Sequence, residues 1–147
     1  MPSPRLAVRA ILLREDRLLL VNAWKGRTHL WTCPGGGVEL HQSLPDALIR
    51  EVREETGLLI EVGKPCLINE FHDPKGSFHQ VDIYFRGRIL SGDPDGAWTD
   101  TEGIVSHRRW VSRAEMAGIT VKPDSLAAAV WGDEGALLYD PLEPIVR

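Results

Sequence analysis

Three glutamates lie within five residues of one predicted helix. Glu51, Glu54 and Glu55 belong to the stretch REVREETGL at residues 50–58. Residues three and four positions apart share one side of a helix, so Glu51 shares a side with both Glu54 and Glu55. Their like charges repel, and the helix dipole disfavours carboxylates near a C-terminus. A divalent cation reverses this repulsion, because Mg²⁺ takes carboxylate oxygens, waters and phosphate oxygens as ligands.

The same glutamates have a plainer interpretation as the solvated face of a helix. The stretch CPGGGVE at residues 33–39 weakens it, because a glycine-rich segment precedes the acidic helix by a short distance. Such a segment predicts a loop whose backbone can approach the helix and a phosphate without Cβ clashes. A tight turn alone also explains the glycines, and the two interpretations are compatible.

Residues 36–58 resemble the signature of the Nudix hydrolases, G-x5-E-x7-R-E-U-x-E-E-x-G-U, where U is aliphatic. Every fixed position of this 23-residue motif matches except one, because Gln42 stands where the family has glutamate. A match of this length is highly specific. The resemblance implies an α/β Nudix fold, a mixed β-sheet sandwiched between α-helices, over a single domain of residues 1–147.

The resemblance also implies an enzyme. Nudix hydrolases are metal-dependent pyrophosphohydrolases that cleave nucleoside diphosphates linked to another group, such as ADP-ribose. By this resemblance Glu51, Glu54 and Glu55 bind Mg²⁺ or Mn²⁺, and Arg50 orients a glutamate through a charge-assisted hydrogen bond. The metal neutralises phosphate oxygens and lowers the pKa of bound water, while one carboxylate, with Glu54 as a candidate, acts as the base.

Gln42 is the departure from the family pattern. It keeps the shape and an acceptor oxygen of glutamate but loses the charge, and Glu39 is not a clear substitute. An alternative function is therefore a Nudix-fold module that binds or senses a nucleotide without hydrolysis. The intact set of Glu51, Glu54 and Glu55 favours hydrolysis.

A further acid is expected from a loop late in the chain. Glu102 lies eight residues before Trp110 and resembles the position from which family members supply another metal ligand or the base. An exposed loop acid is the alternative interpretation. Asp100 is a second candidate for this role, and His107 is a weaker candidate for the base.

Substrate contacts are less specific in the sequence. Gly36 and Gly37 are expected to approach the phosphates, Arg27 to bind them, and Tyr84 to contact the base. Further candidates are Trp24, Phe71 and Trp98 for stacking, Lys75 and Arg86 for phosphates, and residues 121–125 for the base. The alternative is core or rim packing for each aromatic residue, Tyr84 included, and surface solvation for each cation, Arg27 included.

Composition narrows the class of protein. The chain has 147 residues and a net charge of −4, and it lacks the Lys/Arg run of a nucleic-acid binder. No apolar run reaches the roughly 18 residues of a membrane helix. No secretory pattern opens the sequence, and Cys33 and Cys66 form no metal or disulfide framework. We expect a cytoplasmic protein with a small nucleotide substrate, no nucleic-acid or membrane partner and, from the family, a homodimer.

The elements that position these residues follow from hydrophobic periodicity. Residues 5–13 and 18–24 predict a hairpin, and residues 43–56 predict a helix with Ser43 as N-cap and Gly57 as its stop. Further strands are predicted at residues 58–68, broken near 63–65, and at 80–90 and 107–112. Helices are predicted at 112–118 and 123–131, and the tail from residue 132 has no assigned element. In residues 80–90, Gln80, Asp82 and Tyr84 alternate with apolar residues, which indicates two different faces.

Overall fold

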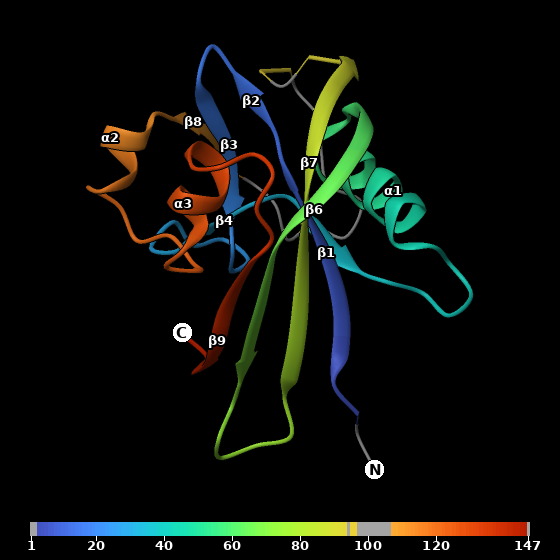
Figure 1. Cartoon of the computed structure of the whole chain (residues 1–147), viewed down its shortest axis with the longest axis vertical. Coiled ribbons are helices and arrows are strands. Elements are labelled where there is room, and N and C mark those ends of the chain that lie inside the picture. The colour runs from blue at the N-terminus through green and yellow to red at the C-terminus, as the bar shows by residue number, and fades with distance from the viewer. Residues whose placement is uncertain (1–2, 94, 97–106, 147) are drawn as a thin grey trace.

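Two β-sheets form the centre of the computed structural model, which describes residues 3–93, 95, 96 and 107–146 (Figure 1). The five-stranded sheet has the order β5-β1-β7-β6-β9. Its strands are β1 (Arg5–Ile11), β5 (Gly35–Gly37), β6 (Leu59–His72), β7 (His79–Ser91) and β9 (Leu138–Pro144). The second sheet contains β2 (Leu13–Arg14), β3 (Arg17–Asn22), β4 (Trp31–Thr32) and β8 (Arg108–Val111).

The larger sheet is mixed. Strand β1 runs parallel to β7 and β6 runs parallel to β9, whereas β1–β5 and β6–β7 are antiparallel pairs. Helix α1 (Leu44–Thr56) lies on one side of this sheet, and the short helices α2 (Arg113–Met116) and α3 (Leu126–Trp131) lie on the other (Figure 1). The predicted α/β class, with a mixed sheet between helices, is confirmed.

Two hydrophobic clusters hold the layers together. The cluster under α1 joins Leu48 and Val52 to Val8 and Phe85 of the large sheet. The cluster under α3 joins residues such as Leu126 to Leu67 and to β3 and β4 of the second sheet. The large sheet therefore buries apolar side chains on both faces, as expected for a sheet with helices on each side.

Helix α1 begins and ends as the sequence predicts. The Ser43 hydroxyl accepts a hydrogen bond from the Asp46 amide at 3.2 Å, which satisfies one of the unpaired N–H groups of the first turn. Gly57 ends the helix in the left-handed region, at φ 76°, and its amide donates to the Arg53 carbonyl. This pair of caps fixes where the glutamates lie along the helix.

The predicted hairpin of residues 5–13 and 18–24 is only partly correct. Strand β3 pairs with the two residues of β2, while β1 belongs to the other sheet. The turn residues Glu15 and Asp16 both have positive φ, which is typical of a tight type I′ hairpin. The chain passes from one sheet to the other between β1 and β2, and local alternation does not show which sheet a strand joins.

The predicted loop at residues 35–37 is wrong. These glycines form β5, which pairs antiparallel with Arg9 to Ala7 of β1. A Cβ at Gly35 would collide with the Val8 carbonyl, so the pairing needs a residue without a side chain. The local sequence predicts a loop because three glycines have low β-propensity by themselves, and only contact with β1 makes them a strand.

Other differences lie toward the C-terminal half. Strand β6 is continuous through the predicted break at residues 63–65, which appears as irregular register between Val62 and Leu67. The unassigned tail forms β9 beside β6. Parallel pairing of β6 and β9 brings together segments far apart in the chain, which periodicity in one segment does not reveal.

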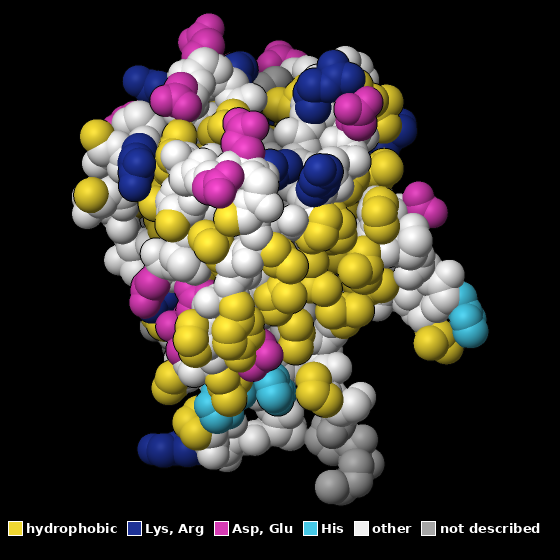
Figure 2. All heavy atoms as spheres, in the orientation of Figure 1, with side chains coloured by type: hydrophobic (Ala, Val, Ile, Leu, Met, Phe, Trp, Pro, Cys, Tyr) yellow, Lys and Arg dark blue, Asp and Glu magenta, His cyan; other side chains and the backbone are white. Residues whose placement is uncertain are grey.

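Large apolar side chains remain exposed on several strands. Leu6, Tyr139 and Leu142 are more than one-third exposed, and Figure 2 shows hydrophobic side chains gathered over the middle of the viewed face. Exposed apolar patches are typical of interaction surfaces, and the expected homodimer stays a prediction.

No helix in the described residues is long and apolar enough to cross a membrane. Cys33 and Cys66 are both buried and free.

We predict that Gly57→Ala destabilises the protein by about 1–2 kcal/mol, because an L residue at φ 76° crowds its own backbone. This corresponds to a melting temperature lower by about 3–6 °C for a domain of this size. Gly118→Ala is the matched control, since Gly118 has no positive φ and an added Cβ would lie 3.5 Å from the nearest backbone oxygen. Equal melting temperatures for the two variants would contradict the assignment of Gly57 as a left-handed cap.

Candidate functional site

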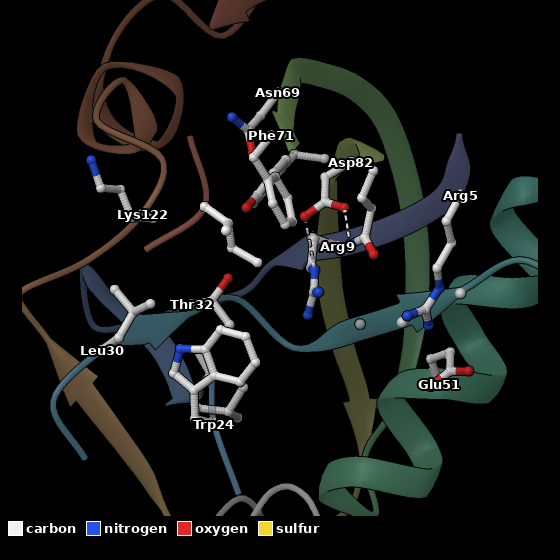
Figure 3. A pocket seen from close by; sticks show the side chains of 18 of the residues that line it. Arg5, Arg9, Trp24, Leu30, Thr32, Glu51, Asn69, Phe71, Asp82 and Lys122 are labelled. Carbon is white, nitrogen blue, oxygen red and sulfur yellow. Dashed lines mark hydrogen bonds and ion pairs between the residues drawn. The ribbon is translucent and has the colours of Figure 1, made fainter. Parts of the chain in front are cut away.

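A cavity of about 760 Å³ lies where helix α1, the glycine strand β5 and the two sheets meet (Figure 3). Arg50, Glu51 and Glu55 reach it from α1, and Gly36 and Gly37 from β5. Its other walls include residues of β1, of the ends of β3 and β4, and of β6, β7 and β9. Residues that are adjacent in the sequence motif therefore meet strands from elsewhere in the chain at one concave site.

Arg50 is the centre of a charged cluster. Its Nη1 donates to the Glu51 carboxylate at 2.9 Å and lies 3.5 Å from Glu54, and its Nη2 lies 3.8 Å from Glu39. Partial burial disfavours the charge on Arg50, but Glu51 and its neighbours more than compensate and raise the pKa of Arg50. The guanidinium therefore offsets the repulsion among the glutamates, as the predicted orienting role requires.

Gln42 also contacts this arginine. The Arg50 Nη2 donates to the Gln42 side-chain oxygen at 3.1 Å and to the Gly37 carbonyl at 3.3 Å. The residue that departs from the motif thus occupies a position from which it holds Arg50. The side-chain amide of Gln42 therefore supports Arg50. A glutamate at this position would add a negative charge beside the Arg50 guanidinium, and glutamine does not.

The glycine strand fits between the glutamates and β1. The Gly35 amide donates to Glu55 at 3.0 Å, which fixes that carboxylate. Glu51 is 7% exposed, and its carboxylate fills the space that a Cβ at Gly36 would take. A side chain at Gly36 would displace the carboxylate, so the motif needs glycine here for contact and not only for a turn.

The carboxylates suit a hard divalent cation by their chemistry, since Mg²⁺ and Mn²⁺ prefer oxygen ligands. Within the described residues, no three His, Cys, Asp or Glu side chains are arranged as a ready metal site. Glu51 and Glu54 lie against Arg50, and Glu55 lies against the Gly35 amide. A bound metal would share these carboxylates with Arg50. Glu102 and Asp100 lie outside the described residues.

A buried polar network forms the part of the cavity wall that comes from β1 and β7. Gln80 donates to Asp82 at 2.6 Å, and the Arg9 Nε donates to the other Asp82 oxygen at 3.3 Å. Tyr84 lies beside them and is 1% exposed; burial, followed by the nearby Asp82 charge, raises its pKa, so its phenol is neutral. Sequence reasoning missed Arg9 and Asp82, although the polar face of residues 80–84 was a signal.

The other predicted contacts divide into two groups. Trp24, Phe71, Tyr84, Gly36 and Gly37 line the cavity, although Tyr84 is buried in its wall; their contacts with a substrate stay predictions.

The second group is not brought to the cavity. Arg27 and Lys75 are exposed residues outside the described lining. Arg86 donates to the Ala129 carbonyl at 2.6 Å, so it secures α3. His107 is exposed and its amide bonds to Asn22. Trp98 lies outside the described residues.

Comparison with known proteins agrees with this geometry. The chain is 32% identical over 98 residues to the ADP-ribose pyrophosphatase of Methanocaldococcus jannaschii, covering 61% of this chain and 54% of that protein. It is 32% identical over 106 residues to a putative 8-oxo-dGTP diphosphatase of Bacillus subtilis, covering 72% and 65%. The chain thus spans about half to two thirds of these curated relatives.

Solved structures share the fold at lower identity. A UDP-X diphosphatase superimposes with a TM-score of 0.73 at 17% identity, covering 95% of this chain and 68% of that one. An ADP-ribose pyrophosphatase from Streptococcus suis gives 0.69 at 22% identity, covering 96% and 100%. The family model described as NUDIX domain matches residues 3–131. With the motif, the fold and this match in agreement, the chain belongs to the Nudix family.

Proposed function

We propose that this protein is a metal-dependent pyrophosphohydrolase that cleaves the diphosphate of a nucleoside diphosphate linked to another group. The observation that carries the proposal is the meeting of Arg50, Glu51 and Glu55 with the glycine strand at one cavity. Relatives named as an ADP-ribose pyrophosphatase and a putative 8-oxo-dGTP diphosphatase support hydrolysis of phosphoric anhydrides. Among family substrates, ADP-ribose is our first candidate.

Each charged residue of the site has its own proposed role. Glu51, Glu54 and Glu55 would hold Mg²⁺ or Mn²⁺, which when bound neutralises phosphate oxygens and acidifies water. Arg50 keeps Glu51 oriented and limits repulsion before the metal binds. The Gly35 amide fixes Glu55. Glu54, which is partly exposed, is our candidate to accept the proton of the attacking water at a carboxylate oxygen. Glu102 stays a second candidate for this role.

The cavity suits a free nucleotide derivative. Its volume of about 760 Å³ lies within the range of about 300–1,000 Å³ that is usual for small-molecule sites. Trp24 and Phe71 supply aromatic surface for a base, and Figure 3 shows them on opposite sides of the space. These features support a small-molecule partner. A cytoplasmic location, like the homodimer, stays a prediction.

A second function has one observation in its favour. Gln42 replaces a motif glutamate, and the described carboxylates are engaged by Arg50 and Gly35. A nucleotide sensor would keep the cavity and lose turnover. Product formation separates it from the hydrolase.

We expect purified protein to hydrolyse at least one member of a panel of nucleoside diphosphate derivatives, with ADP-ribose included, when Mg²⁺ or Mn²⁺ is present. Mass spectrometry identifies the two products, and excess EDTA should abolish the reaction because the carboxylates alone cannot neutralise the phosphates. Binding of a nucleotide without turnover under either metal would support the sensor instead.

Removal of one charge from the acidic cluster should cripple turnover without unfolding the protein. For Glu54→Gln and Glu55→Gln we expect a loss of several kcal/mol in transition-state stabilisation, about 100-fold or more in kcat. Folding should survive, because each change relieves about 0.2–0.5 kcal/mol of repulsion per pair and the amide oxygen introduced by Glu55→Gln would still accept from the Gly35 amide. Glu61→Gln, on the exposed part of β6, is the control. Wild-type kcat in both cluster variants would mean that these carboxylates are only a solvated helix face.

Gln42→Glu should be tolerated and should tighten metal binding. The new carboxylate would lie about where the Gln42 oxygen now lies, 3.1 Å from the Arg50 guanidinium, where it forms a charge-assisted bond of about 1.5–3 kcal/mol and frees charge on the other glutamates. Mg²⁺ titration of activity, with melting curves, measures both effects. Gln42→Met keeps the side-chain volume and removes the acceptor for Arg50, so we expect weaker Mg²⁺ binding and a lower melting temperature. Weaker metal binding in Gln42→Glu than in wild type would contradict the supporting role of this position.

A further inference from the structure

Strand β1 presents to the cavity two arginines that lie outside the sequence motif. Arg5 and Arg9 are four residues apart on a strand, so their side chains project from the same face. Both line the cavity, and Figure 3 shows Arg9 at its centre with Arg5 toward α1. Val8 and Ala10 of the same strand pack under α1, so the two arginines project from the face of β1 that points away from this helix.

Most cations of the cavity are already neutralised by acidic neighbours. Arg50 is bonded to Glu51, and Lys122 lies 2.9 Å from a carboxylate of Asp124. Arg5 and Lys25 are the lining cations for which the described residues offer no hydrogen-bond or ion-pair partner. Lys25 is exposed and follows Trp24 in the chain, at the aromatic end. Of these two lining cations, Arg5 is the one that lies at strand β5, beside the acidic cluster.

Arg9 is held in place before any ligand binds. Its Nε donates to Asp82 at 3.3 Å and its Nη1 donates to the Cys33 carbonyl at 3.3 Å, while its side chain is only 17% exposed. Arginine has five N–H donors in a rigid plane, and these two bonds use two of them. The remaining donors of Arg9 have a fixed orientation at the cavity wall.

Arg5 lies across the glycine strand from the acidic cluster. A Cβ at Gly37 would come within 2.7 Å of the Arg5 guanidinium, whereas a Cβ at the neighbouring Gly36 would meet the Glu51 carboxylate. Successive residues of a strand face opposite sides, so β5 separates the two charges by the thickness of a bare backbone. An anion at this edge would meet the Arg5 guanidinium on the face of β5 opposite the Glu51 carboxylate.

We propose that Arg5 and Arg9 together bind the diphosphate of the substrate, with Arg9 as the preoriented contact and Arg5 as the second cation. The inference rests on the proposed hydrolase function and extends it to residues outside the motif. Planar guanidinium groups suit phosphate oxygens because they donate two parallel hydrogen bonds. In this proposal the two arginines hold and orient the substrate, whereas the carboxylates of α1 would hold the metal.

The test compares Arg5→Met, Arg9→Lys and the control Arg88→Met, whose arginine is 69% exposed and pairs with Glu61. With ADP-ribose and Mg²⁺ we expect Arg5→Met to raise KM about tenfold with kcat within about twofold of wild type, because uniform substrate binding is lost. Arg9→Lys keeps the charge beside Asp82 and loses the planar fork, so we expect a similar rise in KM with a small change in melting temperature. Arg88→Met should change neither.

A direct binding measurement separates this inference from the proposed hydrolysis. Calorimetric titration with α,β-methylene-ADP, which cannot be cleaved at its diphosphate, should show about tenfold weaker binding for Arg5→Met and Arg9→Lys than for wild type and Arg88→Met. That result supports the arginine pair even if the panel of substrates shows no turnover. Wild-type KM and wild-type affinity in both variants, a lower melting temperature of Arg9→Lys without loss of affinity, or no binding of this nucleotide by wild type would overturn it.

Discussion

The site depends on the close contact between strand β5, whose glycines have no side chains, and helix α1, which carries the glutamates. Strand β5 lies against β1 on one side and against α1 on the other. Its three positions are crowded by the Val8 carbonyl, the Glu51 carboxylate and the Arg5 guanidinium in turn. Any side chain there would move one of these groups. The glycines thus set the distance between the acidic helix and the large sheet, and with it the shape of the cavity.

The second constraint is electrostatic. Glu51 is largely buried and its neighbours on α1 carry the same charge, an arrangement that is costly unless a cation is near. Arg50 supplies that cation through bonds to Glu51 and to Gln42. The apo cluster is therefore stabilised by an internal guanidinium, and a divalent ion would take over part of this role. Gln42 fits the arrangement because its oxygen accepts from Arg50 without adding charge.

The part of the cavity wall that belongs to the large sheet is a network of polar side chains. Arg9, Asp82 and Gln80 form a hydrogen-bonded network on neighbouring strands, and Asn69 of β6 pairs in register with Asp82. Each hydrogen bond in this network offsets part of the cost of burying its polar groups. The helix side of the site belongs to the family motif, whereas Arg9, Gln80 and Asp82 on the sheet side lie outside it.

The sequence by itself determined the acidic helix and the family. Caps at Ser43 and Gly57, the spacing of the glutamates and the match to the Nudix motif are local features, readable from consecutive residues. Only the tertiary structure decided that the glycines form a strand, that the tail pairs with β6 and that Arg9 meets Asp82 across 73 positions of the chain. The sequence alone does not show which of Arg27 and Arg9 reaches the site, and of these two only Arg9 lines the cavity. The physical reason is that helix caps and motif spacing act within a few residues, whereas strand partners and cavity walls depend on contacts between distant segments.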